Sequence, residues 1–374
     1  MRFGLKSNPF EWASHDHRMA DRKTEWTNIS RVLNSAYGGQ TCRFVLALGD
    51  YGMGKSFMLN HIYRAATGTQ GVLAVKDVLT ERPIATRSLL RSTTSPEFDI
   101  PSRIVANLGE ERLIELWNKA KNRKLDHIQF KTVFEQLGAG NTVAFRFLVG
   151  ERLTRDELGP LGVKTPLRPP DDTIRSLFAT LKLAHLAGYH SVLVLVDEFE
   201  AIMSKLGPKA AVSVLDALRA IFDEYGPIRT QAAKLVFVFG VSAQAWDKVG
   251  DLEKNMMSKT GGGGISPFVE RILPSDKITL NPFTLKDTIE LVEARLSEVR
   301  EEPTKEKLHP FTNDSLEFVY AVSREKPRVI LQLCYMLLEK ASDEKGISQI
   351  SKTFAEETLR EYNIVAQTDV PSSQ

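Results

Sequence analysis

The chain has 374 residues, of which 42% are hydrophobic and 26% charged, a globular composition long enough for two or three domains. Its net charge of +2 neither requires nor excludes nucleic acid, because nucleic-acid binders usually carry a stronger or clustered basic bias. There is no run of about 18 apolar residues and no apolar leader at the start, and Cys42 and Cys334 lie far apart, so a cytoplasmic protein with reduced thiols and no membrane contact is expected.

Apolar runs without polar alternation predict strands that are buried on both faces of a parallel sheet. Such runs lie at residues 43–49, 71–78, 191–200 and 233–242. Segments with apolar residues at helical spacing lie among them, at 54–66, 172–187 and 209–226. The alternation of strands and helices predicts an α/β fold, a three-layer αβα sandwich around a parallel sheet.

The stretch from about 92 to 170 fits this alternation less well and is expected to be an insertion outside the sheet. It holds a charged helical piece at 110–125 and ends in a series rich in Pro and Gly at 157–172. Basic residues gather in it at 119–124, where they either follow a phosphate backbone or form a solvated helix face.

Strand signals stop after residue 284, and the rest of the chain reads as helical. Four segments have apolar residues at helical spacing, at 284–300, 312–323, 327–342 and 351–362. The expected organisation is an α/β domain over 1–283, an all-helical domain over 284–365 and a frayed tail over 366–374.

A phosphate-binding loop follows the first predicted strand. Gly49, Gly54, Lys55 and Ser56 match the pattern G-x-x-x-x-G-K-[ST], with an apolar strand before it and a helix after it. Glycines let the backbone N–H groups face the phosphates, the lysine supplies charge to the β- and γ-phosphates, and the serine hydroxyl ligates Mg²⁺. A chance match in a glycine-rich turn is the alternative. The predicted nucleotide-binding residues here are Gly49, Asp50, Tyr51, Gly52, Met53, Gly54, Lys55, Ser56 and Phe57.

Two carboxylates end the apolar run VLVLV. We expect Asp197 to hold Mg²⁺ through water and Glu198 to act as general base on the attacking water. A neighbouring parallel strand would bring this pair beside the phosphate loop. The alternative is an acidic turn after a strand, and Glu200 is either a further polar group of the site or solvated.

The phosphate loop and the acidic pair together resemble the AAA+ ATPases, in the clade of initiator and origin-recognition ATPases and their signalling relatives. The resemblance implies ATP and Mg²⁺ as ligands and a helical lid after the α/β domain. It also implies that the segment with Asn8, Pro9 and Phe10, followed by Arg22-x-x-Glu25, lies over the adenine. A simple turn with an anchored aromatic ring is the alternative for Asn8 to Phe10.

Three further roles come from the same resemblance. Ser242 stands at the position of the polar sensor that orients the attacking water, with Gln244 as a second candidate. Arg271 stands at the position of an arginine that acts on the site of a neighbouring subunit, and Arg328 at that of a lid arginine that contacts the γ-phosphate. The alternatives are a strand-end cap for Ser242, a surface arginine or a partner of Glu270 for Arg271, and a solvated helix residue for Arg328.

The stretches at 144–163 and 171–202 resemble the P-loop ATPases of BREX-type phage-defence systems. That resemblance implies a helicase or another defence-system protein as partner. Unlike initiators, the chain has no visible winged-helix segment after the helical domain, which puts autonomous DNA reading in doubt. Four glycines at 261–264 form either a loop that orders on a neighbour or a linker.

The sequence therefore predicts an ATPase that forms a homo-oligomeric ring or filament and remodels or loads a partner on double-stranded DNA. Two alternatives stay open: a slowly hydrolysing signalling switch without DNA contact, and a DNA-bound scaffold in which ATP controls assembly.

Overall fold

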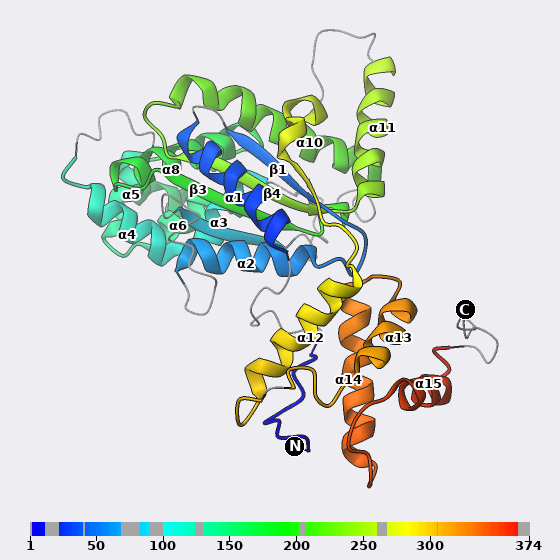
Figure 1. Cartoon of the computed structure of the whole chain (residues 1–374). Coiled ribbons are helices and arrows are strands. Elements are labelled where there is room, and N and C mark those ends of the chain that lie inside the picture. The colour runs from blue at the N-terminus through cyan, green and yellow to red at the C-terminus, as the bar shows by residue number, and fades with distance from the viewer. Residues whose placement is uncertain are drawn as a thin grey trace. The chain divides into compact units, whose positions relative to one another are not determined.

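The computed structural model describes residues 2–11, 22–39, 42–68, 83–89, 100–123, 130–201, 207–259, 268–304 and 306–365 (Figure 1). The expected strand at 71–78, the four glycines at 261–264 and the tail lie outside the described residues. The chain falls into two compact units, which we describe separately. The α/β unit is Thr24–Gly49 with Met58–Thr279, and the helical unit is Met1–Lys23 with Asp50–Phe57 and Leu280–Gln374.

The α/β unit is built on a five-stranded sheet of order β2-β3-β4-β1-β5, in which every pairing is parallel. The strands are β1 (Arg43–Leu48), β2 (Ile84–Leu89), β3 (Ser191–Asp197), β4 (Lys234–Val241) and β5 (Lys277–Thr279). The predictions of β1, β3 and β4 are confirmed. The strands β2 and β5 were missed because IATRSL mixes polar and apolar residues and KIT is only three residues long.

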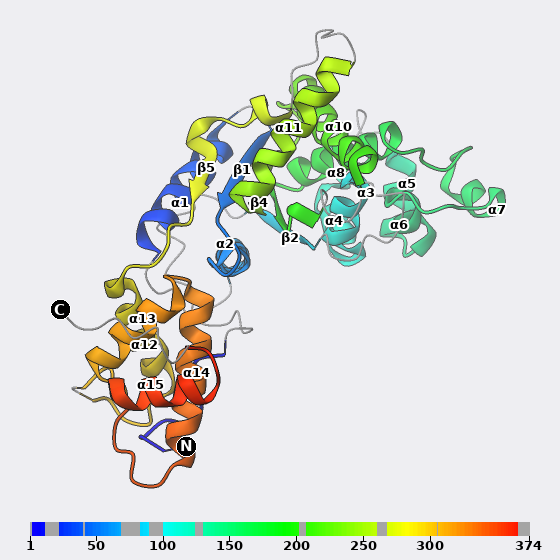
Figure 2. The same cartoon turned by 90° about the vertical axis from the view of Figure 1, so that its right-hand side faces the viewer.

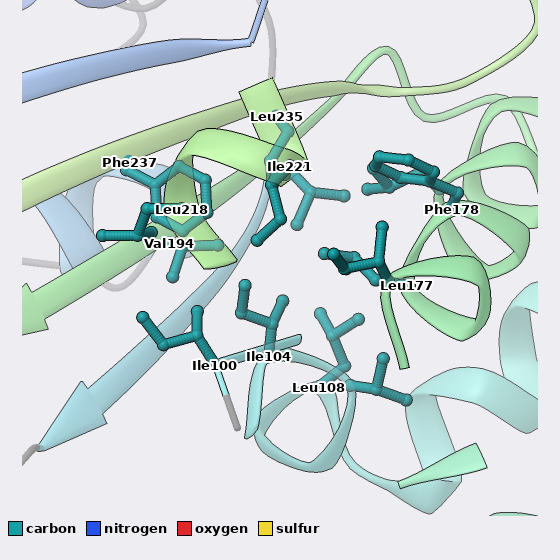
Figure 3. Packing of buried hydrophobic residues seen from close by; sticks show 14 of the residues in the cluster. Ile100, Ile104, Leu108, Leu177, Phe178, Val194, Leu218, Ile221, Leu235 and Phe237 are labelled. Atoms are coloured by element: carbon teal, nitrogen blue, oxygen red, sulfur yellow. The ribbon is translucent and has the colours of Figure 1, made fainter. Parts of the chain in front are cut away.

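Helices cover both faces of this sheet, because successive strand residues point to opposite faces. One face packs against α3 (Ile100–Leu108), α8 (Asp171–Leu186), α10 (Gly207–Tyr225) and α11 (Ala243–Lys259), as Figure 1 shows. Figure 3 shows Ile104 of α3, Leu177 of α8 and Leu218 of α10 meeting around the strand residues Val194 and Phe237. The predicted three-layer α/β fold is thus confirmed.

The opposite face carries α1 (Lys23–Gly38) and α2 (Lys55–Thr67). Arg87 of β2 reaches α2 from this side, where its guanidinium donates a 2.8 Å hydrogen bond to Asn60 Oδ1. The rings of Trp26 on α1 and His61 on α2 meet edge to face with centroids 4.7 Å apart. The helix that follows the phosphate loop is therefore fixed to the sheet by polar and aromatic contacts.

The stretch expected as an insertion is helical and adds no strand within its described residues. It begins with α3, which packs against the sheet, and continues with α4 (Glu110–Ala120), α5 (Lys131–Gly138), α6 (Thr142–Leu148) and α7 (Arg155–Leu158). Figure 2 shows α5, α6 and α7 on the side of α3 and α8 that is away from the strands. Trp117 is buried against Gly138, where an added Cβ would come within 2.1 Å of the indole. Trp117, Trp246 and Phe268 all lie in the core.

The helical unit contains the four predicted helices. They are α12 (Leu285–Val299), α13 (Asn313–Ser323), α14 (Pro327–Asp343) and α15 (Lys352–Glu361). The first residues of the chain pack with them, since Leu5 and Phe10 are fully buried in the helical core and Leu5 forms an antiparallel bridge with Arg300. Among the described helices of both units, none is long and apolar enough to cross a membrane.

The buried imidazole of His61 should make the stability of the protein depend on pH. Burial, with the nearby charge of Arg64, lowers the pKa of His61 to about 4 from its ordinary 6.5. The folded state therefore keeps His61 neutral while the unfolded chain takes up a proton between pH 6.5 and 4. The contribution is fully present above pH 6.5 and is lost toward pH 4, by up to about 3 kcal/mol of unfolding free energy.

Denaturant unfolding of the wild type and of His61→Leu between pH 4 and 7 measures this contribution. The unfolding free energy of the wild type relative to that of His61→Leu should decrease as the pH falls. His190→Gln, at an exposed position, serves as the matched control and should follow the wild type. A constant difference across the range would contradict the prediction.

Candidate nucleotide-binding site

The phosphate loop has the backbone that its sequence predicts. Gly52 and Gly54 have φ angles of +86° and +90°, a region that disfavours other residues. Met53 N–H donates to Asp50 O at 3.2 Å, and the Lys55 ammonium donates to the same carbonyl at 3.2 Å. The ammonium group is thus folded back over the loop, and α2 begins at Lys55, so its first N–H groups can face an anion.

The carboxyl ends of three strands lie side by side at one edge of the sheet. Gly49 follows β1 and donates its N–H to Val241 O at the end of β4 at 3.2 Å. Phe199, after β3, donates its N–H to Gly240 O on the other side of β4 at 3.1 Å. The prediction that β3 neighbours β1 is wrong, because β4 lies between them. The acidic pair and the start of the phosphate loop still share one edge.

The acidic pair has an ordered and strained backbone. Glu198 has a φ of +54°, which costs a residue other than glycine about 1 kcal/mol or more. Its N–H donates to Asp197 Oδ1 at 2.9 Å, which fixes the aspartate carboxylate, itself 5% exposed. The turn therefore leaves the Glu198 side chain only partly buried beside a buried aspartate. Such left-handed residues cluster at functional sites.

The donors that the chain offers fit a magnesium ion. Mg²⁺ prefers hard oxygen ligands and binds proteins through few side chains, keeping several waters and substrate oxygens. The hydroxyl of Ser56 and the carboxylate of Asp197 are donors of this kind. These are the residues that would hold a magnesium ion.

The hydroxyl of Ser242 caps a helix. Ser242 Oγ accepts a hydrogen bond from Ala245 N–H at 3.2 Å, at the start of α11. A capping hydroxyl keeps its own hydrogen, so it can still donate to a bound water. Gln244, the second candidate sensor, is exposed on the first turn of α11. Both lie after β4, between the phosphate-loop strand and the acidic strand.

Arg328 contacts the phosphate loop within the helical unit. It is the second residue of α14, its N–H donates to Gly52 O at 3.3 Å, and its guanidinium carbon lies 5.1 Å from the centroid of the Tyr51 ring. The structure thus places Arg328 against Gly52 and Tyr51 of the loop. Its contact with a γ-phosphate stays a prediction.

A second arginine holds the loop from another side. Arg22 is 7% exposed and donates to Met53 O at 3.0 Å and to Asn281 O at 2.6 Å. Its guanidinium also lies 4.7 Å from the centroid of the Phe283 ring. The sequence singled out Arg22 only as part of a motif, and nothing in the pattern indicates that it binds a loop carbonyl.

Arg271 forms a two-pronged ion pair with Asp223. It lies at the end of the short helix η5 (Phe268–Arg271), and its Nε and Nη2 donate to the Asp223 carboxylate at 2.7–3.0 Å. Glu253 anchors η5 by accepting from the N–H groups of Phe268 and Val269. Burial raises the pKa of Glu253. The partner of Arg271 is thus a residue 48 positions away, which the sequence did not indicate.

The segment with Asn8 and Phe10 is committed to the helical unit. Phe10 is fully buried, with its ring edge-on to Phe311 at 5.6 Å, and the Asn8 amide donates to Tyr335 O at 3.2 Å and Glu339 Oε1 at 2.9 Å. Pro9 is buried beside them. These are the contacts of an anchored turn, and the binding of adenine by this segment stays a prediction.

The fold and the site together define the class of the chain. It has an α/β P-loop fold: an αβα sandwich with a parallel sheet, a phosphate loop after β1, an acidic pair after β3 and, later in the chain, four further helices. A family model described as BREX system ATP-binding protein BrxC/D matches residues 19–94. This segment holds β1, the phosphate loop, α2 and β2, so the predicted resemblance to BREX-type ATPases is confirmed there.

Solved structures share the fold at low sequence identity. The Aeropyrum pernix ORC2 protein, in ADPNP-ADP complexes, aligns over 96% of this chain and 72% of its own with TM-score 0.50 and 12% identity. Drosophila ORC bound to DNA aligns over 96% and 65% with TM-score 0.41 and 14% identity. A Thermotoga maritima RuvB mutant aligns over 92% and 71% with TM-score 0.42 and 12% identity. No curated protein matches the chain.

Proposed function

We propose that this protein hydrolyses ATP. The observation that carries the proposal is that the strained acidic turn of Asp197 and Glu198 lies at the same sheet edge as the start of the phosphate loop. Binding of nucleotide alone needs only the loop, whereas an acidic pair at this edge supplies what the attack of water needs. The match to an ATP-binding family and the nucleotide complexes of the Aeropyrum ORC2 protein support ATP as the ligand.

The reaction is attack of water on the γ-phosphate, and each named residue has one task in it. Lys55 and the loop N–H groups bind the phosphate oxygens; Ser56 and Asp197 would hold a magnesium ion, which would neutralise phosphate charge. Glu198 accepts the proton of the attacking water, and the hydroxyl of Ser242 orients that water. Arg328 stabilises the charge that spreads over the γ-phosphate oxygens in the transition state.

Arg271 completes the site of a neighbouring subunit, so the active form is a homo-oligomer, either a ring or a filament. For this role the ion pair with Asp223 has to open. Asp223 is half exposed, whereas the Arg271 side chain is only 12% exposed. The phosphate oxygens of a triphosphate would replace the carboxylate as the anionic partner of the guanidinium.

The biological task we propose is remodelling or loading of a partner on double-stranded DNA in phage defence. The match to the BREX ATP-binding family favours defence, with a helicase or another system protein as partner. The two alternatives are a signalling switch without DNA contact and a DNA-bound scaffold whose assembly ATP controls.

ATP turnover with and without double-stranded DNA distinguishes these tasks. We expect turnover by the full chain that DNA raises several-fold and that declines with salt, because phosphate contacts release counterions. Lys55→Ala should lose turnover in both conditions, and any turnover that remains in it measures contaminating ATPase. Strong stimulation would exclude the signalling switch, and absence of DNA binding at low salt would exclude both DNA-linked tasks.

A further inference from the structure

Tyr51 is exposed at an unusual place. It is the second residue after Gly49 in the phosphate loop, and 74% of its side chain is accessible, the largest fraction among the exposed large hydrophobic side chains described. A loop that only wraps phosphate through backbone N–H groups needs no aromatic ring at this position. Among the described residues, the ring belongs neither to the core of the sheet and its covering helices nor to the core of the helical unit, so its contacts must be sought on the surface of the helical unit.

The Arg328 guanidinium lies over one face of this ring. The guanidinium carbon lies 5.1 Å from the ring centroid, within the range in which an arginine is attracted to an aromatic face. The backbone of Arg328 is tied to the same loop, since its N–H donates to Gly52 O at 3.3 Å. The first carbon of the Arg328 side chain also lies near the loop, since a Cβ added to Gly52 would be 3.5 Å from Arg328 Cβ. Both ends of the side chain are therefore fixed on the phosphate loop.

Such an arrangement lowers the entropy cost of ordering the Arg328 side chain on a bound ligand. A free arginine side chain loses much rotamer freedom when it is ordered on a ligand, and a side chain already held near its place loses less. A cation–π contact at an exposed site changes an equilibrium by about two- to fivefold. Tyrosine and phenylalanine both provide this face, whereas leucine fills similar space without it.

We propose that Tyr51 is a positioning residue that holds the Arg328 guanidinium beside the phosphate loop before the triphosphate binds, and thereby favours ATP over ADP. The inference rests on the proposed function, since it concerns how this site recognises the γ-phosphate. Only the backbone of Tyr51 belongs to the predicted phosphate-binding loop; its side chain acts through Arg328 and not on the nucleotide. Its loss should therefore affect a triphosphate and leave a diphosphate unchanged.

Equilibrium binding of the imido analogue of ATP (ADPNP) and of ADP, each with Mg²⁺, tests this on the full chain. Tyr51→Leu should weaken ADPNP by about two- to fivefold and leave ADP affinity unchanged. Tyr51→Phe, the matched control, should keep the wild-type affinity for both. In an Arg328→Ala background, Tyr51→Leu should have no further effect, because the group that it positions is gone. An exposed position should tolerate these changes, and thermal melting confirms folding.

The proposal would be overturned by equal weakening of ADPNP and ADP by Tyr51→Leu, by a Tyr51→Phe variant as weak as Tyr51→Leu, or by an undiminished effect of Tyr51→Leu in the Arg328→Ala background. The first would mean that Tyr51 shapes the loop or touches the nucleotide itself. Failure of the wild type to bind either nucleotide would overturn the proposed function and this inference with it. Binding by the wild type with no change in Tyr51→Leu would overturn the inference alone.

Discussion

Replacing Glu198 with glutamine is expected to lower ATP turnover by about 10²- to 10⁴-fold, the usual contribution of a general base. Glutamine has nearly the same shape but cannot accept the proton of the attacking water. The contacts that fix this turn are backbone ones: Glu198 N–H donates to Asp197 Oδ1, and Ala201 N–H donates to Glu198 O at 2.8 Å. The substitution should therefore leave the loop, the metal ligands and ATP binding intact.

Single-turnover hydrolysis and ATP binding, measured on the same protein, check this expectation. The variant should retain bound ATP and, if ATP drives assembly, accumulate as the oligomer in size-exclusion chromatography. Glu200→Gln is the matched control two residues away and should turn over ATP at close to the wild-type rate. Normal hydrolysis by Glu198→Gln would show that another group takes the proton. Slow hydrolysis by Glu200→Gln alone would move the assignment to that residue.

The sheet and the phosphate loop could be read from the sequence because their chemistry restricts residue types locally. A buried parallel strand needs a continuous apolar run, which β1, β3 and β4 have. A phosphate loop needs glycines with positive φ, and Gly52 and Gly54 have them. The strand β2 does not need a continuous apolar run, because among the described strands it pairs with β3 alone, at the edge of the sheet, and it keeps Arg87 partly buried against α2.

The partners of the charged groups could not be read in this way. Arg22 binds Met53 O and Asn281 O, and Arg271 binds Asp223, through separations that only the folded chain brings together. Periodicity predicts which face of a helix is buried, but it carries no information about which loop carbonyl an arginine meets. The same holds for Phe10, whose burial in the helical core follows from tertiary packing and not from its own motif.

The two arginines predicted near the γ-phosphate are held in different ways. Arg328 is attached to the phosphate loop of its own chain, through its backbone and through Tyr51. Arg271 lies on η5 in the α/β unit and is neutralised by Asp223 of α10. An arginine that acts on another chain has to be rigid at its base and free to change partner at its tip. Glu253 anchors η5 and so meets the first condition, and the tip of Arg271 would have to exchange the half-exposed Asp223 carboxylate for phosphate.

Arg271→Ala is accordingly expected to reduce turnover by about 10³-fold or more while ATP affinity stays at the wild-type value. An arginine supplied in trans contributes to the transition state and not to the ground-state complex, so turnover and binding should separate. Asp223→Asn is the matched control, because it breaks the same ion pair and keeps the guanidinium. If Arg271 serves only to stabilise the fold through Asp223, the two variants should lose thermal stability and turnover alike.

Mixing two inactive variants gives the sharpest test of a shared site. Arg271→Ala subunits keep the base Glu198 but cannot supply an arginine to a neighbouring subunit. Glu198→Gln subunits can supply Arg271 but lack the base. In a mixed oligomer, an Arg271→Ala subunit can receive the arginine of a Glu198→Gln neighbour, so turnover should reappear although each protein alone has little. If Arg271 acts within its own chain, no mixture restores activity at any ratio.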